Sequence, residues 1–325
     1  MNIFDVDCER KDAAIVILPV PWEATTSYGQ GTAYGPELIL RASAQQDLYD
    51  FYFKDNYKAG FFWQNHSEEI LESSFTTRKL CELAMQGDKQ ALAETNKHCA
   101  AMNEYVYKNC LQILEEDKIP AVVGGDHSTP LGLIRAIGEK YQGDYGILHI
   151  DAHADLRKAY QGFTYSHASI FYNVMTSDFL PKKLVQVGIR DYCEEEALRI
   201  EQSEGRIHTF FDAALKERES WRESCEEIAA ALPERVYLSV DIDGFDPKLC
   251  PNTGTPVPGG LDFWQFQQLL HVLVGSGKKI IGFDLNEVSA GPEYDLEQEW
   301  DGNVGMRILF QLCGWCVESQ KQKIS

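Results

Sequence analysis

The sequence predicts an α/β fold of three layers, in which helices cover both faces of a central, mostly parallel sheet. Short apolar runs rich in Val or Ile indicate the strands, because runs without polar–apolar alternation are typical of strands covered on both faces. Helical patterns separate these runs, as expected of a doubly wound sheet. The runs are Ala14–Leu18, Ala121–Val123, Gly146–Ile150, Leu184–Ile189, Val236–Val240 and Lys279–Phe283.

Helix signals lie between the runs. Asp262 and Gln265 have the spacing of a capping box, and Gly275 stands where that helix should end. One amphipathic helix is predicted from an apolar stripe at helical spacing. The stripe consists of Met102, Val106, Cys110 and Ile113.

Two more helices are predicted from residues that favour helix starts. Asp212 is expected to cap a helix through Leu232, and Thr129 to cap one that has Pro130 at its first position. We expect residues 1–325 to form a single domain. The segment around 50–100 is rich in Asn, Lys and Glu and lacks a strand signal, so a helical insertion on the surface is expected there.

Composition excludes several classes of protein. The chain has 325 residues, 44% of them hydrophobic, which excludes a disordered chain. Its net charge of −20 argues against nucleic acid and anionic membranes as partners, since both require a basic surface. No apolar stretch reaches the roughly 18 residues of a membrane span, and acidic residues near the N-terminus do not fit a signal peptide. A cytoplasmic protein is therefore expected.

The cysteines indicate buried thiols. There are nine, an odd number, and their spacing is irregular, which favours a reduced protein over a disulfide framework. Cys313 and Cys316 form a C-x-x-C pair, which raises the alternative of a redox role. The apolar helical context around them favours the structural interpretation.

Polar clusters follow four of the predicted strands, at the edge where open α/β sheets bind ligands. Because the carboxyl ends of parallel strands meet at one edge, we expect these clusters to lie together. They are GGDHS at 124–128, DAHAD at 151–155, DID at 241–243 with Asp246, and Asp284 with Glu287.

Six side chains of these clusters are typical metal ligands. Carboxylates in one pocket repel each other unless cations neutralise them, and alternate residues of an extended D-x-H-x-D or D-x-D segment point to one side. Imidazoles and carboxylates without a thiolate favour harder divalent ions such as Mn²⁺, and six ligands favour a carboxylate-bridged pair of ions about 3.5–4 Å apart. The six are His127, Asp151, His153, Asp155, Asp241 and Asp243.

Each motif alone has a simpler interpretation. The D-x-H-x-D segment could be a single magnesium site or a solvated turn, and GGDHS could be a tight turn with a capping Asp126. The D-x-D pair carries little information by itself. Their joint occurrence at strand ends favours the binuclear site.

Three motifs together resemble a known family. GGDHS at 124–128, DAHADLR at 151–157 and SVDIDGFDP at 239–247 are similar to the signatures of the arginase–agmatinase–formimidoylglutamase superfamily, the ureohydrolases. The segment VPWEATTSY at 20–28 and Ser166-His167-Ala168 resemble agmatinases in particular. The resemblance covers the chain from Pro19 onwards and implies an arginase-like fold.

The resemblance also implies roles for individual residues. Two Mn²⁺ ions per subunit would be bound, with Asp151 and Asp241 bridging them. Asp155 would orient the attacking hydroxide and move its proton, Glu287 would anchor the guanidinium, and His167 would shuttle protons. One ion would be held by His127, Asp151, Asp155 and Asp241, and the other by Asp151, His153, Asp241 and Asp243.

Other polar residues are given supporting roles. Asp126 is expected to support His127 or cap the next turn, and Ser239 and Asp284 to lie behind the ligands. His149 is interpreted as a core histidine that faces away from them. Arg157 could approach the tail of the substrate, which would favour a guanidino acid unless an acidic residue neutralises it.

The leading hypothesis is a manganese-dependent hydrolase that converts agmatine, a small cationic guanidino substrate, to putrescine and urea. Other guanidino compounds, including arginine, a guanidino acid or guanidine, and formimidoylglutamate remain alternatives. A regulatory protein on the same fold and a binuclear phosphoesterase are further alternatives. By analogy with the family, a homotrimer or homohexamer is expected.

Overall fold

The computed structural model describes residues 2–297 and 299–321. Its centre is an eight-stranded sheet in which the strands pair in parallel, in the order β2-β1-β3-β8-β7-β4-β5-β6. The strands are β1 (Ile15–Val20), β2 (Phe61–Trp63), β3 (Ile119–Gly124), β4 (Gly146–Ile150), β5 (Lys183–Ile189), β6 (Ile207–Phe211), β7 (Arg235–Asp241) and β8 (Lys279–Asn286).

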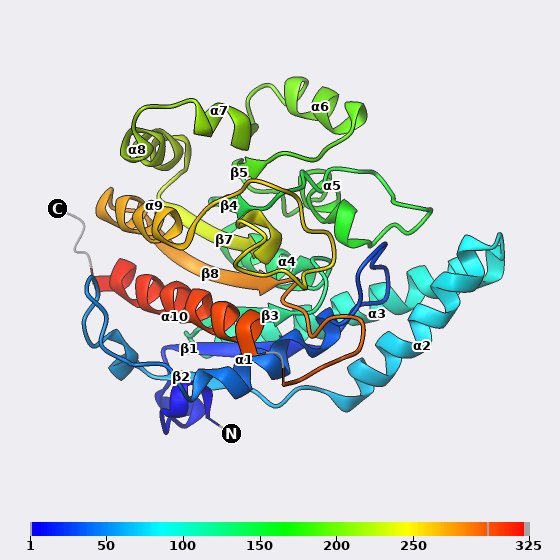
Figure 1. Cartoon of the computed structure of the whole chain (residues 1–325), viewed down its shortest axis with the longest axis horizontal. Coiled ribbons are helices and arrows are strands. Elements are labelled where there is room, and N and C mark those ends of the chain that lie inside the picture. The colour runs from blue at the N-terminus through cyan, green and yellow to red at the C-terminus, as the bar shows by residue number, and fades with distance from the viewer. Residues whose placement is uncertain (1, 298, 322–325) are drawn as a thin grey trace.

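Helices cover both faces of this sheet (Figure 1). The α-helices are α1 (Gly35–Ser43), α2 (Glu68–Met85), α3 (Lys89–Glu115), α4 (Leu131–Tyr141), α5 (Ile170–Met175), α6 (Glu194–Glu201), α7 (Asp212–Lys216), α8 (Trp221–Ala231), α9 (Phe263–Gly275) and α10 (Glu299–Lys321). The 3₁₀ helices are η1 (Ile3–Asp5), η2 (Arg10–Asp12), η3 (Thr32–Tyr34), η4 (Asn56–Ala59), η5 (His167–Ser169) and η6 (Ile242–Gly244).

Two apolar cores lie on opposite faces of the sheet. One joins the sheet to α1, α8, α9 and α10, and includes Ile39, Ile228 and Phe266. The other joins it to α3, α4 and α5 and includes Val106 and Ile137. In Figure 1 the helices α1, α9 and α10 stand in front of the sheet and α4 stands behind it. The predicted three-layer fold is therefore confirmed, with a sheet that is parallel throughout.

All six predicted strands form, several of them longer by a few residues than the apolar runs. Two edge strands carry no such run. The strand β6 has an exposed His208 and a half-buried Thr209, because its outer side has no neighbouring strand. The strand β2 has only three residues and pairs with β1, so the segment around 50–100 is not wholly helical. Burial on both faces, which produces a continuous apolar run, is found in the interior of the sheet.

Helix capping follows the prediction at one site and differs at two. Asp262 and Gln265 form the capping box of α9, which ends at Gly275 as expected. The Asp212 prediction is wrong: this residue lies inside the short α7, and Ser220 caps the separate helix α8.

The Thr129 prediction is also wrong. Pro130 is itself the N-cap of α4, which begins at Leu131. The Thr129 hydroxyl bonds instead to the carbonyl of Asp126 and to Asn286, so it is engaged in tertiary contacts and does not cap the helix.

The cysteines are unpaired throughout. Cys313 and Cys316 are buried in α10, and burial raises the pKa of both thiols, which keeps them protonated. The Cys316 thiol lies 3.6 Å from the carbonyl of Ile280 on β8. These contacts agree with the structural interpretation of the C-x-x-C pair.

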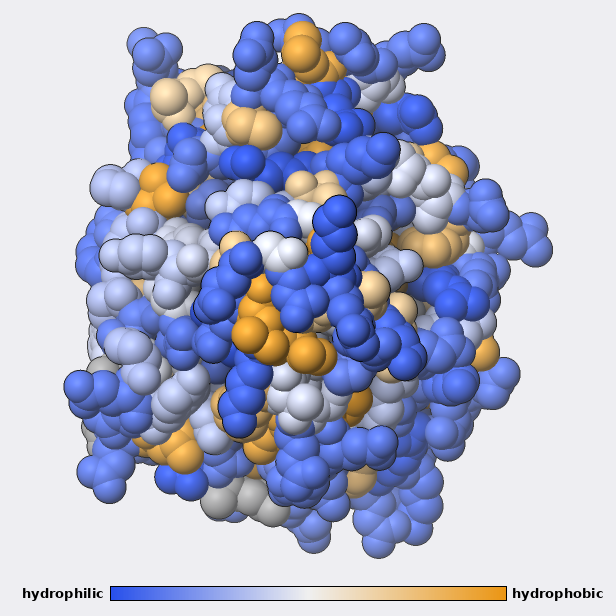
Figure 2. All heavy atoms as spheres, turned by 90° about the vertical axis from the view of Figure 1, so that its right-hand side faces the viewer, coloured by the Kyte–Doolittle hydropathy of each residue, from blue (hydrophilic) through white to orange (hydrophobic). Residues whose placement is uncertain are grey.

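The carboxyl ends of the strands open onto one face of the molecule. The arrowhead of β8 points to the right of Figure 1, and Figure 2 shows the face seen from that side. This face is largely hydrophilic, with a small group of hydrophobic residues near its centre. In the described part of the chain, none of the helices is long and apolar enough to cross a membrane.

Candidate metal centre

Four neighbouring strands in the middle of the sheet deliver the predicted site residues. In the order of the sheet they are β3, β8, β7 and β4. His127 follows β3, Glu287 follows β8, Asp241 ends β7, and Asp151 follows β4. Because the strands are parallel, all four residues reach the same edge, although they are far apart along the chain.

The segments that follow the strands turn sharply. Asp241 accepts a hydrogen bond from the amide of Asp243 at 2.8 Å, and Asp151 accepts one from the amide of His153 at 2.6 Å. Gly244 packs so closely on β4 that a Cβ there would lie 2.7 Å from the nitrogen of Asp151. These contacts bring the two acidic motifs together, and a larger residue at 244 would separate them.

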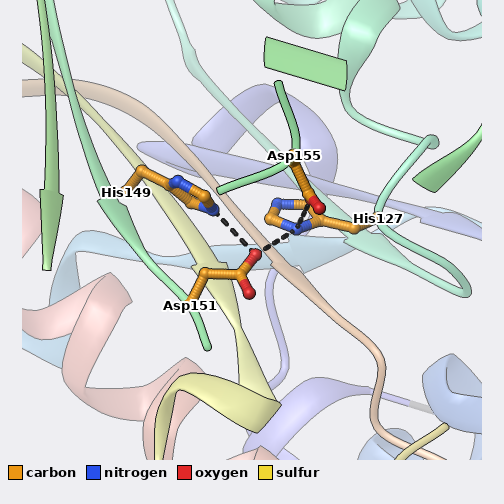
Figure 3. A group of neighbouring side chains, drawn as sticks. All are labelled: His127, His149, Asp151 and Asp155. Atoms are coloured by element: carbon orange, nitrogen blue, oxygen red, sulfur yellow. Dashed lines mark hydrogen bonds and ion pairs between the residues drawn. The ribbon is translucent and has the colours of Figure 1, made fainter. Parts of the chain in front are cut away.

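The ring of His127 points at three carboxylates. Its Nδ1 lies 3.0 Å from Asp151 Oδ2, 3.3 Å from Asp155 Oδ2 and 3.2 Å from Asp241 Oδ2. Figure 3 shows His127 between Asp151 and Asp155, with His149 on the far side of Asp151. One nitrogen and three oxygens thus converge on a small, buried volume.

A second group adjoins the first. His153 Nδ1 lies 3.0 Å from Asp243 Oδ2 and 3.4 Å from Asp151 Oδ1. Asp151 therefore contributes one oxygen to each group. The structure brings all six predicted ligand residues together, in two neighbouring groups that share this carboxylate.

The charges in this cluster are unbalanced without a cation. Burial and the neighbouring Asp151 raise the pKa of Asp155 to about 7, and burial with Asp243 raises that of Asp241 well above its usual range. Among the ion pairs of the described residues, only histidines face the four ligand aspartates. Converging carboxylates and imidazoles, with no Lys, Arg or thiol, fit hard divalent ions.

A chain of hydrogen bonds orients His127. Ser239 donates to Asp284 Oδ1 at 3.0 Å, so its oxygen is free to accept from His127 Nε2, also at 3.0 Å. This arrangement assigns the ring proton to Nε2 and leaves the Nδ1 lone pair facing the aspartates. Tyr237 donates to the other oxygen of Asp284. Ser239 and Asp284 therefore lie behind the ligands, as expected, and Asp126 accepts from Ser128 at the start of the turn.

His149 is buried, as expected of a core histidine, but the prediction that it faces away from the candidate ligands is wrong. Its Nε2 lies 2.8 Å from Asp151 Oδ2, and its Nδ1 accepts a hydrogen bond from Gln186 at 3.0 Å. The Gln186 bond assigns the proton to Nε2, so His149 donates to the shared carboxylate. The spacing of two residues to Asp151 could have revealed this contact, because alternate residues of an extended segment point to the same side.

Glu287 lies directly beside the cluster. Its Oε1 accepts a hydrogen bond from the amide of His127 at 2.9 Å, and its φ of 64° places it in the left-handed region. Asp155 shares that unusual backbone conformation, with a φ of 54°. Such strain persists only where surrounding contacts enforce it and is frequent at functional sites. Burial and the nearby Asp126 raise the pKa of Glu287.

A cavity of about 150 Å³ opens onto the cluster. His153, Asp155 and His167 line it, together with Ser27 of the N-terminal loop. Burial and the nearby His153 lower the pKa of His167 to about 4, so its ring is neutral near pH 7. Its Nε2 lies 3.5 Å from the Ser27 hydroxyl. A larger cavity of about 640 Å³ between α3 and α4 holds none of the predicted site residues.

Arg157 also lines this cavity, where sequence reasoning placed it, and it has an acidic partner. Its Nε lies 3.6 Å from Glu196 Oε2 on α6. Glu196 was not predicted to be part of the site, because it lies 39 residues further along the chain. Asp191 was missed for the same reason, whereas Tyr160 lies close to Arg157 in the sequence and was missed because no motif marks it.

Comparison with protein families matches residues 13–314 to the Arginase family. The chain belongs to this family. With the buried cluster of His and Asp side chains, it is a metal-dependent ureohydrolase that has a binuclear metal site. Membership of the arginase family favours hydrolysis of a guanidino compound over the regulatory and phosphoesterase alternatives.

The proteins most relevant for comparison have names that refer to different substrates. The chain is 31% identical to an N(1)-aminopropylagmatine ureohydrolase of Synechocystis, over 96% of this chain and 92% of that protein. Its fold matches the crystal structure of agmatine ureohydrolase of Thermoplasma volcanium with a TM-score of 0.77 at 25% identity, covering 99% and 96% of the two chains. A Trypanosoma cruzi formiminoglutamase variant with Mn²⁺ has a TM-score of 0.76 over 98% and 97%, but at 16% identity this likeness shows the fold alone.

Proposed function

We propose that the chain hydrolyses a guanidino compound with a positively charged tail, with agmatine as the first candidate and putrescine and urea as products. The observation that carries this proposal is the six-residue cluster beside Glu287, two members of which line a cavity where Arg157 is paired with Glu196. Relatives named for agmatine and for N(1)-aminopropylagmatine support a cationic tail.

Two Mn²⁺ ions are proposed as the resident metals. His127, Asp151, Asp155 and Asp241 would hold one, because the three carboxylates lie within 3.3 Å of His127 Nδ1. The second would be held by His153 and Asp243 with the shared Asp151 and Asp241. When bound, such a pair lowers the pKa of water so that a hydroxide nucleophile is available near neutral pH.

The chain's own residues would position the substrate and move protons. A carboxylate such as Glu287 suits the planar guanidinium, which it can bind through two hydrogen bonds. Asp155, which lines the cavity, would orient the nucleophile and accept its proton on a carboxylate oxygen. His167 is neutral near pH 7, so its ring can accept a proton and pass it towards the leaving amine.

N(1)-aminopropylagmatine is the second candidate, favoured by the Synechocystis relative. It shares the guanidino end of agmatine and extends the amine tail. Arginine and guanidino acids carry a carboxylate, which gains little from an Arg157 that already faces Glu196.

A panel of substrates tests the proposal. Protein loaded with Mn²⁺ is assayed for urea with agmatine, N(1)-aminopropylagmatine, arginine, 4-guanidinobutyrate, 3-guanidinopropionate and guanidine, and for formamide with formimidoylglutamate. We expect the largest kcat/KM for one of the two amine-tailed compounds. Preference for a carboxylate-bearing compound would contradict the proposed tail, and release of formamide alone would identify the formimidoylglutamate alternative.

The cytoplasmic location and the homotrimer or homohexamer stay predictions. Light scattering of the purified protein would measure the oligomeric state directly.

A further inference from the structure

Arg157 and Glu196 form a charged pair in the lining of the cavity, and other contacts restrain each of them. Glu196 is buried, with 3% of its side chain exposed, and Arg157 is 36% exposed. Their closest atoms, Arg157 Nε and Glu196 Oε2, are 3.6 Å apart. Both residues line the same cavity as Asp155 and His167, so this pair faces the part of a substrate that projects away from the metal ligands.

Backbone contacts anchor the carboxylate of Glu196. Its Oε1 accepts a hydrogen bond from the amide of Leu156 at 3.0 Å, and its Oε2 accepts one from the amide of Cys193 at 2.9 Å. The first bond joins it to the segment that follows Asp155, and the second closes the capping box of α6. The carboxylate therefore has a defined position whether or not a substrate is bound.

Arg157 is restrained as well. Its amide donates to the carbonyl of Ala168 at 3.2 Å, and its guanidinium carbon lies 5.1 Å from the centre of the Tyr160 ring. The guanidinium thus lies near both an aromatic ring and the carboxylate of Glu196. The Arg157 guanidinium is therefore not a free cation in the cavity.

The net charge of the residues that line the cavity follows from this pairing. Apart from His167 and the candidate metal ligands, the residues with ionisable acidic or basic side chains that line the cavity are Arg157, Glu196 and Asp191. Arg157 and Glu196 cancel, and Asp191 is 68% exposed on its side chain. One negative charge remains, which attracts an ammonium group and repels a carboxylate.

We infer that Glu196 is a positioning residue that sets the charge class of the substrate, by neutralising Arg157 so that the cavity takes a guanidino compound with a cationic tail. The inference rests on the proposed function and names a determinant of its specificity. Without the charge of Glu196, Arg157 would be free to pair with a carboxylate tail, and the same site would turn towards guanidino acids.

The test compares two substrates that share the guanidino end and differ in the charge of the tail. Agmatine and 4-guanidinobutyrate are assayed with Mn²⁺-loaded wild type, Glu196→Gln, Arg157→Gln and the double variant. The readout is the ratio of kcat/KM for agmatine to that for 4-guanidinobutyrate. Glu195→Gln is the matched control, because Glu195 lies on the same helix but pairs with Arg199, away from the cavity.

We expect wild type to favour agmatine and Glu196→Gln to lower the ratio by about tenfold or more, as expected for an Arg free to bind a carboxylate. The double variant should return the ratio to within about threefold of wild type, because no free cation is left. Glu195→Gln should keep the wild-type ratio. A merely structural role of Glu196 would lower both activities together and would not be rescued by removing Arg157.

Distinct results would overturn the inference. A double variant that stays as low as Glu196→Gln would show that the carboxylate acts on the substrate without Arg157. If Glu196→Gln fails to fold, Arg157→Gln alone decides: it leaves the negative charges of Glu196 and Asp191 uncompensated, so its ratio should equal or exceed that of wild type, and a ratio about tenfold lower would overturn the inference. Absence of urea from both substrates and from N(1)-aminopropylagmatine would instead refute the proposed function.

Discussion

Asp151 is the residue on which the geometry of the site depends. Its Oδ2 faces His127 and His149, and its Oδ1 faces His153 and that residue's amide. Two oxygens of one carboxylate thus face two ligand groups. The contact with His149 supplies a hydrogen bond to the buried charge, which lowers the cost of keeping it ionised.

Asp241→Asn should remove most of the bound metal and abolish urea release. The substitution keeps the shape of the side chain but removes a negative charge proposed to be shared by two cations. Metal content is measured by elemental analysis of the purified variant. Asp246→Asn is the control, because Asp246 lies on an exposed turn of the same segment and pairs with Lys248. Full metal content in Asp241→Asn would refute the ligand assignment.

His167→Ala should lower kcat by about 10²–10⁴, the range for loss of one acid–base group. Metal content should stay at the wild-type level, since the ring contacts Ser27 and Tyr160 and is not among the candidate ligands. His208→Ala serves as the control, because that ring stacks on Phe210 at the far edge of the sheet. A kcat within about twofold of wild type would show that His167 has no catalytic role.

At the scale of elements, the N-terminal loop depends on contacts with helices. The Arg78 side chain of α2 donates to the carbonyl and hydroxyl oxygens of Thr26. Glu23 accepts hydrogen bonds from the amides of Gly31 and Ala33 at 2.7 and 3.2 Å. These bonds hold the loop that carries Ser27 over the cavity, so α2 positions part of the site without contributing a ligand.

Arg78→Ala should therefore raise KM by about tenfold, because an ordering contact of a charged group contributes on the order of 1.5–3 kcal/mol. The metal content should be unchanged. Steady-state kinetics with the preferred substrate provide the measurement, and Lys79→Ala, at the next and exposed position of α2, is the control. Equal KM values for the two variants would show that the loop keeps its position without Arg78.

At the scale of the whole molecule, the metal site and the fold are coupled. The ligands follow β3, β4 and β7, and the buried aspartates repel one another when no cation is present. A metal that binds only the folded state adds to the free energy of unfolding, by about 2.7 kcal/mol when its concentration is 100 times Kd.

Removal of metal with a chelator should consequently lower the melting temperature by roughly 4–8 °C, about 4 °C for each ion, and added Mn²⁺ should restore it. Scanning calorimetry measures both transitions. Asp241→Asn should show a much smaller shift on chelation, because it holds less metal. Identical melting curves with and without chelator in the wild type would contradict the coupling.

The elements that sequence predicted best are those in the interior of the sheet. Gly146–Ile150 coincides with β4, and the run at Val236–Val240 lies inside β7, because both strands are covered on two faces. The edge strands β2 and β6 carry weaker patterns and were missed. Thr129 and Asp212 failed as caps because tertiary contacts or an early helix end override local preference at those positions.

The six candidate ligand residues could be predicted to cluster because each motif lies at the end of a strand and the chemistry of metal binding limits the residue types. The carboxyl edge of the sheet then brings them together, as the distances around His127 show. His149, Glu196 and Asp191 were not predicted. Glu196 and Asp191 acquire their roles through neighbours that only the folded chain supplies, whereas the contact of His149 with Asp151 follows from their spacing at the end of β4.

The sequence by itself determined the layered fold, the family and the residue types that can bind metal, because burial patterns and ligand chemistry are local properties. Tertiary structure decided which charges face the substrate. From the sequence alone, Arg157 is a cation without an assigned acidic partner. The fold places it against Glu196 of a helix that is distant in the sequence. The net charge of a cavity is a sum over side chains from separate segments, and it exists only once those segments have come together.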